Sequence, residues 1–449
     1  MLERIFKVRE RGSTVGREVL GGATTFFTMS YIIFVQPAVL AQCGMDFGAV
    51  MVATILSSAL ATVVMAFAAN YPIALAPAMG HNFFFVFTVC GAVAAGGLGL
   101  TWQQGLAATV ISGAIFILLS KAGFRSALMN SVPASLKQGI SAGIGLFIAL
   151  IGLEYAHLVV AAPGTLVSLG KVTDPVAALA LFGILVTLML MALRVHGALL
   201  LGMLATLGLS LLLGLVKFHG VFSAPPSLAP TFFALDFPGL FSINFLELVT
   251  VIFVILFMDL FDTVGTVIGV GTRAGWIKDG KMPRGEQVLF SDAVGTVAGA
   301  CLGTSTVTSY IESATGVAAG AKTGLANLVT AALFLLALFF APLAKMIGGG
   351  IEVAPQVFKY PIIAPALIIV GALMMQSLRD IEWDDATEGI PAFLTLTIMP
   401  FTFSIANGIA FGFVSYAAAK ALSGRWRECP VIVYIFAVLF VIEYTVMKT

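Results

Sequence analysis

The sequence predicts an all-α integral membrane protein with about fourteen membrane-spanning segments. Composition is the first reason, because 59% of the 449 residues are hydrophobic, only 10% are charged and the mean hydropathy is +1.05. A soluble domain carries roughly 25% charged residues, so a soluble chain of this composition could not cover its own surface. The second reason is that apolar residues occur in runs, such as 174–193, close to the ~20 residues that a helix needs to cross a bilayer.

The apolar runs follow one another without a long polar stretch, which indicates a single integral membrane domain over residues 1–449. A linker rich in Pro and Phe, 217–242, divides the chain into two halves that we interpret as repeats, 15–216 and 243–447. The expected spans are 17–41, 49–69, 79–97, 103–120, 134–156, 174–193, 197–216, 243–270, 288–302, 309–321, 323–347, 362–378, 389–405, 407–422 and 430–447.

The placement of Lys and Arg predicts the orientation. The basic start, Arg125, Lys137 and the loop 273–284 all fall on one side if the N-terminus is cytoplasmic. Arg425 and Arg427 also look cytoplasmic, which leaves an odd number of runs, so either the last run is interfacial or an earlier one is re-entrant. The charged start continues into the first run without a small-residue cleavage site, so no cleavable signal peptide is expected. We expect a multi-pass protein of the cell membrane with a cytoplasmic N-terminus.

Each half contains one short, interrupted segment at its third span. These are 71–87, YPIALAPAMGHNFFFVF, and 303–320, GTSTVTSYIESATGVAAG. Pro72 and Pro77 prevent a regular helix in the first of them. Non-helical backbone at membrane depth survives only inside protein or beside a water-filled cavity. Paired interrupted segments in matching positions of two halves are typical of a transporter, and seven spans per half would make the repeats inverted.

Three carboxylates lie at mid-span in the eighth and tenth spans, and no Lys or Arg accompanies them there. They are Asp259, Asp262 and Glu312. Ionisable groups inside a membrane are costly and usually functional. An unpartnered carboxylate in hydrocarbon tends to take up a proton, which is the chemistry of a proton-coupled carrier. The alternatives are that these acids end helices at the water surface, or that Asp259 only packs. His81 has two interpretations, a proton relay or a structural group.

Polar and aromatic side chains accompany these acids in the two interrupted segments. Asn82 offers both a hydrogen-bond donor and an acceptor. Phe83 and the two phenylalanines after it could supply an aromatic face. Thr308 and Tyr310 belong to the polar run before Glu312. We expect the two segments together to bind a small polar solute.

Several other classes of function are not expected. The net charge is +1, which gives no basis for nucleic-acid binding. No His, Cys or Asp cluster has metal-ligand spacing, and no P-loop is present. An intramembrane aspartyl protease would place its aspartates on separate helices, whereas Asp259 and Asp262 are three residues apart. We expect no enzyme activity, no metal and no cofactor.

Four stretches carry a resemblance to a known family: GREVLGGATTFFTMSYIIFVQPAVL, APAMGHNFFFVFTV, DLFDTVGT and TSTVTSYIESATGVAAGAKTGL. Together they resemble the azaguanine-type adenine–guanine–hypoxanthine permeases of the uracil/xanthine (nucleobase–cation symporter 2) permease superfamily, over nearly the whole chain. The resemblance implies two inverted seven-span repeats, with a core domain of spans 1–4 and 8–11 and a gate domain of spans 5–7 and 12–14. It also implies short antiparallel strands in spans three and ten that meet at mid-membrane.

The resemblance implies import of purine nucleobases (adenine, guanine or hypoxanthine) by proton symport. Asp262 and Glu312 match the acids of spans eight and ten, and Asn82 with the backbone of Phe83 matches the substrate-contacting strand. His81 stands where a Leu is more usual. Related carriers are often dimers through the gate domain. The substrate-binding residues expected are Asn82, Phe83, Asp262, Thr308, Tyr310, Ile311 and Glu312, and the candidates for proton coupling are His81, Asp259, Asp262 and Glu312.

Two alternatives keep the same architecture. One is a uracil- or xanthine-type nucleobase carrier. The other is an anion exchanger or channel, which should place a Lys or Arg near the two interrupted segments. Lys322 alone lies there, downstream of the second segment, and this argues against anions.

Overall fold

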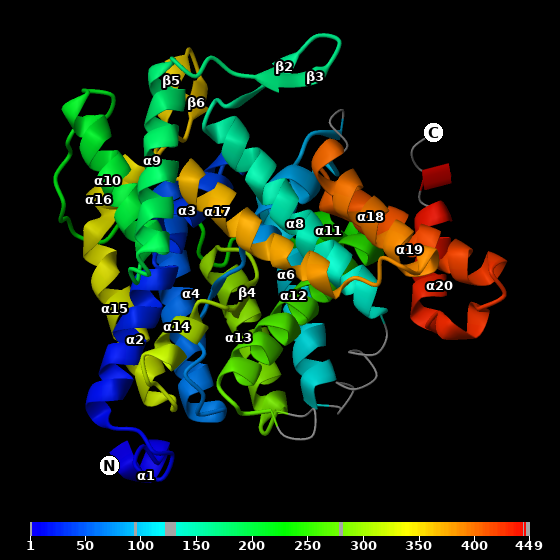
Figure 1. The fold of residues 1–449 in the computed structure, drawn as a ribbon, viewed down its shortest axis with the longest axis horizontal. Coiled ribbons are helices and arrows are strands. Elements are labelled where there is room, and N and C mark those ends of the chain that lie inside the picture. The colour runs from blue at the N-terminus through cyan, green and yellow to red at the C-terminus, as the bar shows by residue number, and fades with distance from the viewer. Residues whose placement is uncertain (1, 94–96, 122–131, 278–281, 443, 446–449) are drawn as a thin grey trace.

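The computed structural model describes residues 2–93, 97–121, 132–277, 282–442 and 444–445 as a bundle of packed helices (Figure 1). The chain is mostly helical and multi-pass, as predicted, while the total of fourteen spans stays a prediction. Arg125, Lys278 and Lys281 of the orientation argument lie outside the described residues. Eight described helices are long and apolar enough to cross a membrane: Val15–Cys43, Phe47–Ala68, Trp102–Ser120, Ala134–Tyr155, Pro175–Ala192, Phe245–Arg273, Leu325–Gly348 and Ile405–Leu422.

The first span is broken where the sequence predicts one continuous run, 17–41. Helix α2 (Val15–Met29) ends there and α3 (Ile32–Leu40) begins. Pro37 lies inside α3 and supplies no backbone N–H. In the turn before it, the N–H groups of Ile33 and Phe34 bond to carbonyls only three residues earlier. The break leaves Tyr31 at the start of α3, fully inside the protein.

The other described elements are helices and six short strands. In the first half they are α1 (Leu2–Phe6), α4 (Phe47–Ala68), β1 (Leu75–Pro77), α5 (Met79–Phe83) with a π-helical turn (Phe84–Val89), α6 (Trp102–Lys121), α8 (Ala134–Tyr155), β2 (Val159–Ala162), β3 (Leu166–Leu169), α9 (Pro175–Ala192) and α10 (Ala198–Leu212). In the second half they are α11 (Phe237–Phe241), α12 (Phe245–Arg273), α13 (Gly285–Leu302), β4 (Val307–Ser309), α14 (Ser313–Ala318), α15 (Leu325–Ala337), α16 (Ala341–Gly348), β5 (Ile351–Ala354), β6 (Val357–Lys359), α17 (Ala364–Met374), α18 (Ala386–Phe401), α19 (Ile405–Leu422) and α20 (Val431–Ile442).

The two halves repeat the same set of contacts. In the first half α4 packs against β1 and against α15, and in the second half α13 packs against β4 and against α6. Likewise α9 pairs with α10, as α18 pairs with α19, and α8 packs along α17 where the halves meet. The hairpins β2–β3 and β5–β6 lie together at one end of the molecule, and α1 lies at the other (Figure 1). These paired contacts agree with two repeats, whose exact bounds remain a prediction.

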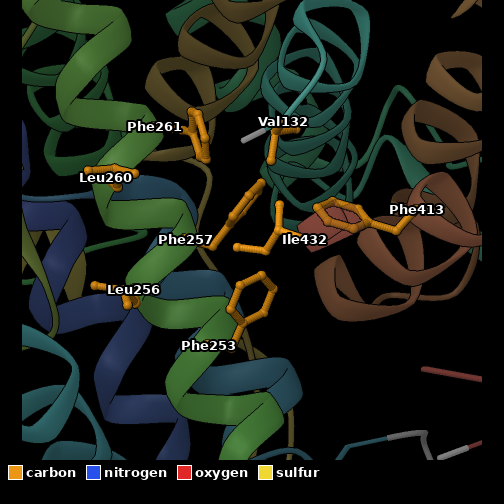
Figure 2. A pocket seen from close by; sticks show the side chains of 8 residues that line it. All are labelled: Val132, Phe253, Leu256, Phe257, Leu260, Phe261, Phe413 and Ile432. Atoms are coloured by element: carbon orange, nitrogen blue, oxygen red, sulfur yellow. The ribbon is translucent and has the colours of Figure 1, made fainter. Parts of the chain in front are cut away.

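The surface between the predicted core and gate helices is built largely from phenylalanine. On α12, Phe257 meets Phe413 of α19 with ring centroids 5.5 Å apart. Figure 2 shows the small apolar pocket at this place, between α12 on one side and α19 and α20 on the other. The pocket is lined by Val132, Phe253, Leu256, Phe257, Leu260, Phe261, Phe413 and Ile432.

The last apolar run, 430–447, contains a helix of 12 residues, α20. Residues 443 and 446–449 of this run lie outside the described residues, so both interpretations of the odd run, an interfacial last run or a re-entrant earlier one, remain predictions.

A buried lysine ties α18 and α19 together near the end of α19. The Nζ atom of Lys420 lies 2.8 Å from Glu388 Oε1 and 3.1 Å from Glu428 Oε2, and Tyr416 also donates to Glu388. Lys420→Met should lower the melting temperature of the detergent-purified protein. The expected loss is about 1–2 kcal/mol, because Glu388 keeps the Tyr416 bond but loses its cation. Lys345→Met, at an exposed site on α16, is the matched control, and equal melting temperatures would contradict the prediction.

Candidate functional site

Strands β1 and β4, one from each interrupted segment, pair antiparallel inside the protein. Ala76 lies opposite Thr308 in the middle of the ladder, and all residues of both strands are buried. The ladder is extended by a bond from the Ala78 N–H to the Thr306 carbonyl at 3.0 Å. The predicted short strands of spans three and ten are therefore confirmed, and they meet each other.

Equivalent threonines hold the two strands from the neighbouring helices. The Thr62 hydroxyl on α4 donates to the Leu75 carbonyl at 3.2 Å. The Thr296 hydroxyl on α13 lies 3.0 Å from the Val307 carbonyl and 2.8 Å from Asp259 Oδ2, and its one proton is shared between these two acceptors. A polar side chain thus satisfies a strand carbonyl in each half, where no third strand is present among the described residues to do so.

Asp262 and Glu312 lie close to each other beside this strand pair, and we call the group formed by Asp262, Gly265, Ile311 and Glu312 the recess. Glu312 accepts a hydrogen bond from the Tyr31 hydroxyl at 2.8 Å and lies close enough to act electrostatically on Asp262. Asp262 is exposed, and a Cβ placed on Gly265 would meet no atom within 4 Å. Ile311, next to Glu312, is 46% exposed. The recess thus presents two carboxylates, one from α12 and one from the segment after β4.

The recess continues along one face of α12. Asp262, Gly265, Ile268 and Thr272 are exposed, and their spacing of three and four residues places them on one stripe. Residues of the same helix from Phe257 to Leu260 are buried. The exposed stripe runs from Asp262 to the C-terminal end of α12.

Asn82 is fully buried and keeps one amide donor unused. Its Oδ1 accepts a hydrogen bond from the Ser305 hydroxyl, which in turn accepts from Gln36 Nε2 at 3.1 Å. Asn82 Nδ2 and Gln36 Oε1 have no hydrogen-bond partner among the described residues. A polar ligand or a water molecule at this point could satisfy both atoms.

Asn82 and Phe83 lie on helix α5 and not on a strand, which corrects the position expected for them. Pro72 and Pro77 keep the chain extended only as far as β1, and the chain turns into α5 directly afterwards. The backbone of Phe83 is therefore helical. Its ring is buried, stacks on Phe87 with centroids 6.1 Å apart, and meets Phe147 of α8 at 6.3 Å.

The side chains of Thr308 and Tyr310 are used inside the protein. The Thr308 hydroxyl is hydrogen-bonded to that of Thr263 at 2.8 Å, which joins β4 to α12. The Tyr310 hydroxyl donates to the Pro77 carbonyl and so joins the end of β4 to the end of β1. Both hydroxyl groups are therefore occupied by contacts within the protein.

His81 and Asp259 are buried away from solvent. Neither ring nitrogen of His81 has a hydrogen-bond partner among the described residues. Asp259 Oδ2 accepts from the Thr296 hydroxyl at 2.8 Å. Within the described part of the chain no group of three His, Cys, Asp or Glu side chains could hold a metal ion.

Four polar residues near the site were missed by sequence reasoning. Tyr31 and Gln36 follow the break in the first span, which carries no Gly or Pro at the break itself. Lys137 of α8 places its Nζ 5.0 Å from the centre of the Phe261 ring, next to Asp262 in the sequence. Asp292 lies on α13, which begins earlier than predicted, so this acid lies deeper in its helix than the sequence suggested.

The bond from Tyr31 to Glu312 has a measurable consequence. Tyr31→Phe removes the hydroxyl and leaves Glu312 without its donor, so the carboxylate is no longer held in one orientation. Substrate affinity should fall about tenfold, the size expected for a hydrogen bond to a charged group. The measurement is KM for uptake in cells. Tyr434→Phe, which removes a peripheral hydroxyl from α20, is the control, and unchanged KM in both variants would contradict the prediction.

Sequence comparisons find permeases. The model of a permease family, Xan_ur_permease, matches residues 16–411. The adenine permease AdeP of Escherichia coli is 44% identical over 445 residues, covering 99% of this chain and 96% of AdeP. The guanine/hypoxanthine permease PbuG of Bacillus subtilis is 42% identical over 459 residues, covering 100% of each chain.

Two solved structures share the fold at low sequence identity. The transmembrane domain of the cyanobacterial bicarbonate transporter BicA has a TM-score of 0.60 at 14% identity, covering 90% of this chain and 96% of that domain. The structure of SLC26A9 also has a TM-score of 0.60, at 12% identity, covering 97% of this chain and 67% of the other. Identities this low support the arrangement of core and gate helices and nothing about the solute.

Proposed function

This chain belongs to the permease family, and we propose that within this family it imports purine nucleobases by symport with protons. Membership makes the protein a multi-pass transporter and not an enzyme. The substrate class is supported by relatives named for adenine and for guanine and hypoxanthine, which align over essentially the full chain.

One observation carries the proposal: two carboxylates, Asp262 on α12 and Glu312 directly before α14, lie close to each other beside the strand pair. A purine has a planar face and an edge of N–H groups and ring nitrogens. Asp262 and Glu312 would accept its N–H groups, and the free Nδ2 of Asn82 would donate to a ring nitrogen or carbonyl. A base without these N–H groups would leave the two acceptors unpaired and be rejected.

The remaining candidate residues would form the walls of this site. We propose that Ile311, which is exposed in the recess, packs on the face of the base. The backbone of Thr308 and the anchored ring of Tyr310 would form the floor at the strand ends. Phe83 would close the side that faces the gate helix α8.

Proton coupling would use an acid that changes its charge during the cycle. The candidates are His81, Asp259, Asp262 and Glu312. Two ionised carboxylates at one site repel each other, so a proton taken up on one acid would favour binding of the neutral base. Core and gate would then move against each other along the phenylalanine surface between them.

We further propose that the protein lies in the cell membrane with a cytoplasmic N-terminus, and that two copies associate through the gate domain. The distribution of Lys and Arg supports the orientation.

An anion exchanger is the second candidate, because BicA, a bicarbonate transporter, has the same fold. Anion binding would require a cation in the recess to outweigh its two acids. Uptake of labelled sulfate or bicarbonate equal to that of adenine would favour this alternative.

The deciding experiment measures uptake of labelled hypoxanthine in cells that express the protein. Unlabelled adenine, guanine, hypoxanthine, xanthine and uracil compete in parallel, with and without a proton uncoupler. Competition by the purines and loss of accumulation with the uncoupler are expected. Preferred competition by uracil or xanthine would point to the other nucleobase carriers, and uptake unaffected by the uncoupler would reject symport.

A further inference from the structure

The carboxyl groups of Asp259 and Asp292 form a pair buried between α12 and α13. Both residues are 0% exposed, and the two carboxyls lie within hydrogen-bonding range of each other. Thr296 donates to Asp259 at 2.8 Å, and the N–H of Ser309 donates to Asp292 Oδ1 at 2.8 Å. Neither carboxylate opens on the recess that contains Asp262.

Each member of the pair has one oxygen without a hydrogen-bond donor. These atoms are Asp259 Oδ1 and Asp292 Oδ2, and no described residue donates to either. If both acids were ionised, two negative charges would face each other in a buried site and both oxygens would stay unsatisfied. One shared proton removes a charge and forms an O–H···O bond between the carboxyls.

The charged groups that act on the pair are acidic. The charge of Asp262 acts electrostatically on Asp259, and the charges of Asp292 and Glu312 act on Asp262. α4 meets α13 with the uncharged side chain of Ala61, and α6 meets it at Gly113, which has no side chain. Lys137 of α8 lies against the ring of Phe261 on the same helix as Asp259.

The pair is connected directly to β4. Asp292 Oδ1 accepts both the N–H of Ser309 and its hydroxyl, the latter at 3.1 Å. On the preceding residue, the Thr308 hydroxyl is bonded to Thr263 of α12. A change in the charge of the pair therefore acts on the strand that ends at the recess.

From this geometry we infer that the Asp259–Asp292 pair is the proton-carrying site of the permease, separate from the acids that contact the base. The inference rests on the proposed proton symport and assigns the proton to one place. In each cycle the ionised pair takes up one proton, which becomes shared between Asp259 Oδ1 and Asp292 Oδ2, and releases it to the other side of the membrane.

The test uses the full-length protein in proteoliposomes. Accumulation of labelled hypoxanthine under an imposed pH gradient is compared with counterflow at equal pH. Asp292→Asn keeps the Oδ1 that holds Ser309 but cannot carry a proton. In Asp292→Asn the ratio of accumulation to counterflow should fall about tenfold or more, because the free energy that couples proton movement to purine transport would be lost. Asp292→Glu should recover part of it, and Glu286→Gln, an exposed acid on the same helix, should match the wild type.

An unchanged ratio in Asp292→Asn would overturn the inference. A second measurement needs neither substrate nor transport: the infrared carbonyl stretch of a protonated carboxylic acid in the purified chain at neutral pH. The band should be present in the wild type and in Glu286→Gln, and lost in Asp259→Asn or Asp292→Asn. If the band is still present in both the Asp259→Asn and the Asp292→Asn variant, the inference is overturned, whether or not the protein binds a purine. If the wild type shows no counterflow of hypoxanthine, the proposed function is rejected, independently of the inference about the acid pair.

Discussion

Asp262→Asn and Glu312→Gln are each expected to abolish saturable purine uptake. Both changes keep the shape of the side chain and remove the charge that would accept a ring N–H of the base. A hydrogen bond to a charged group contributes about 1.5–3 kcal/mol, so affinity should fall about 10- to 150-fold. The expected loss is large because the two acids occupy one recess and would bind the same edge of the base. Saturable uptake and direct binding of labelled hypoxanthine measure the effect.

The control is Glu247→Gln, which removes a carboxylate from the opposite end of α12. It should transport like the wild type, with the same amount of protein in the membrane. If both site variants instead transport purines at wild-type rates with an unchanged pH dependence, the assignment of the site is wrong.

The sequence predicts the centre of this site well because its chemistry is local. Pro72 and Pro77 exclude a regular helix, and a polar run before Glu312 inside an apolar chain is costly unless it lines a site. Asp262 could be found because a mid-span acid is costly in hydrocarbon. The pairing of β1 with β4 followed from the resemblance and is confirmed by the structure.

The parts that sequence reasoning missed depend on contacts between distant residues. Tyr31 reaches Glu312 across 281 residues of chain, and nothing in the local pattern around Tyr31 marks it. Asp292 lies near the start of its apolar run, whereas its helix begins earlier and places this acid deeper. The position of Asn82 was wrong for a different reason: a proline ends a strand as readily as it prevents a helix, so local sequence could not fix where α5 begins.

Gly316→Ala is expected to destabilise the core and to displace Glu312. Helices α2 and α14 cross at Gly316, where an added Cβ would lie 2.1 Å from Thr25 Oγ1 and 2.5 Å from the Gly21 carbonyl oxygen. Backbone atoms cannot rotate away, so α14 must shift. We expect a loss of about 3 kcal/mol, at the upper end for overpacking, with loss of uptake because α14 begins directly after Glu312.

Gly208→Ala makes the same chemical change in helix α10, where an added Cβ would meet no atom within 4 Å. Alanine is the better helix former by about 0.8–1 kcal/mol, so this variant should melt at or slightly above the wild-type temperature and keep full uptake. Thermal melting in detergent and uptake in cells separate the two variants. The changes in stability have opposite signs because of the space around each glycine, since both substitutions remove the same backbone freedom. If the two alanine variants melt at the same temperature, the close crossing of α2 and α14 does not hold Glu312 in place.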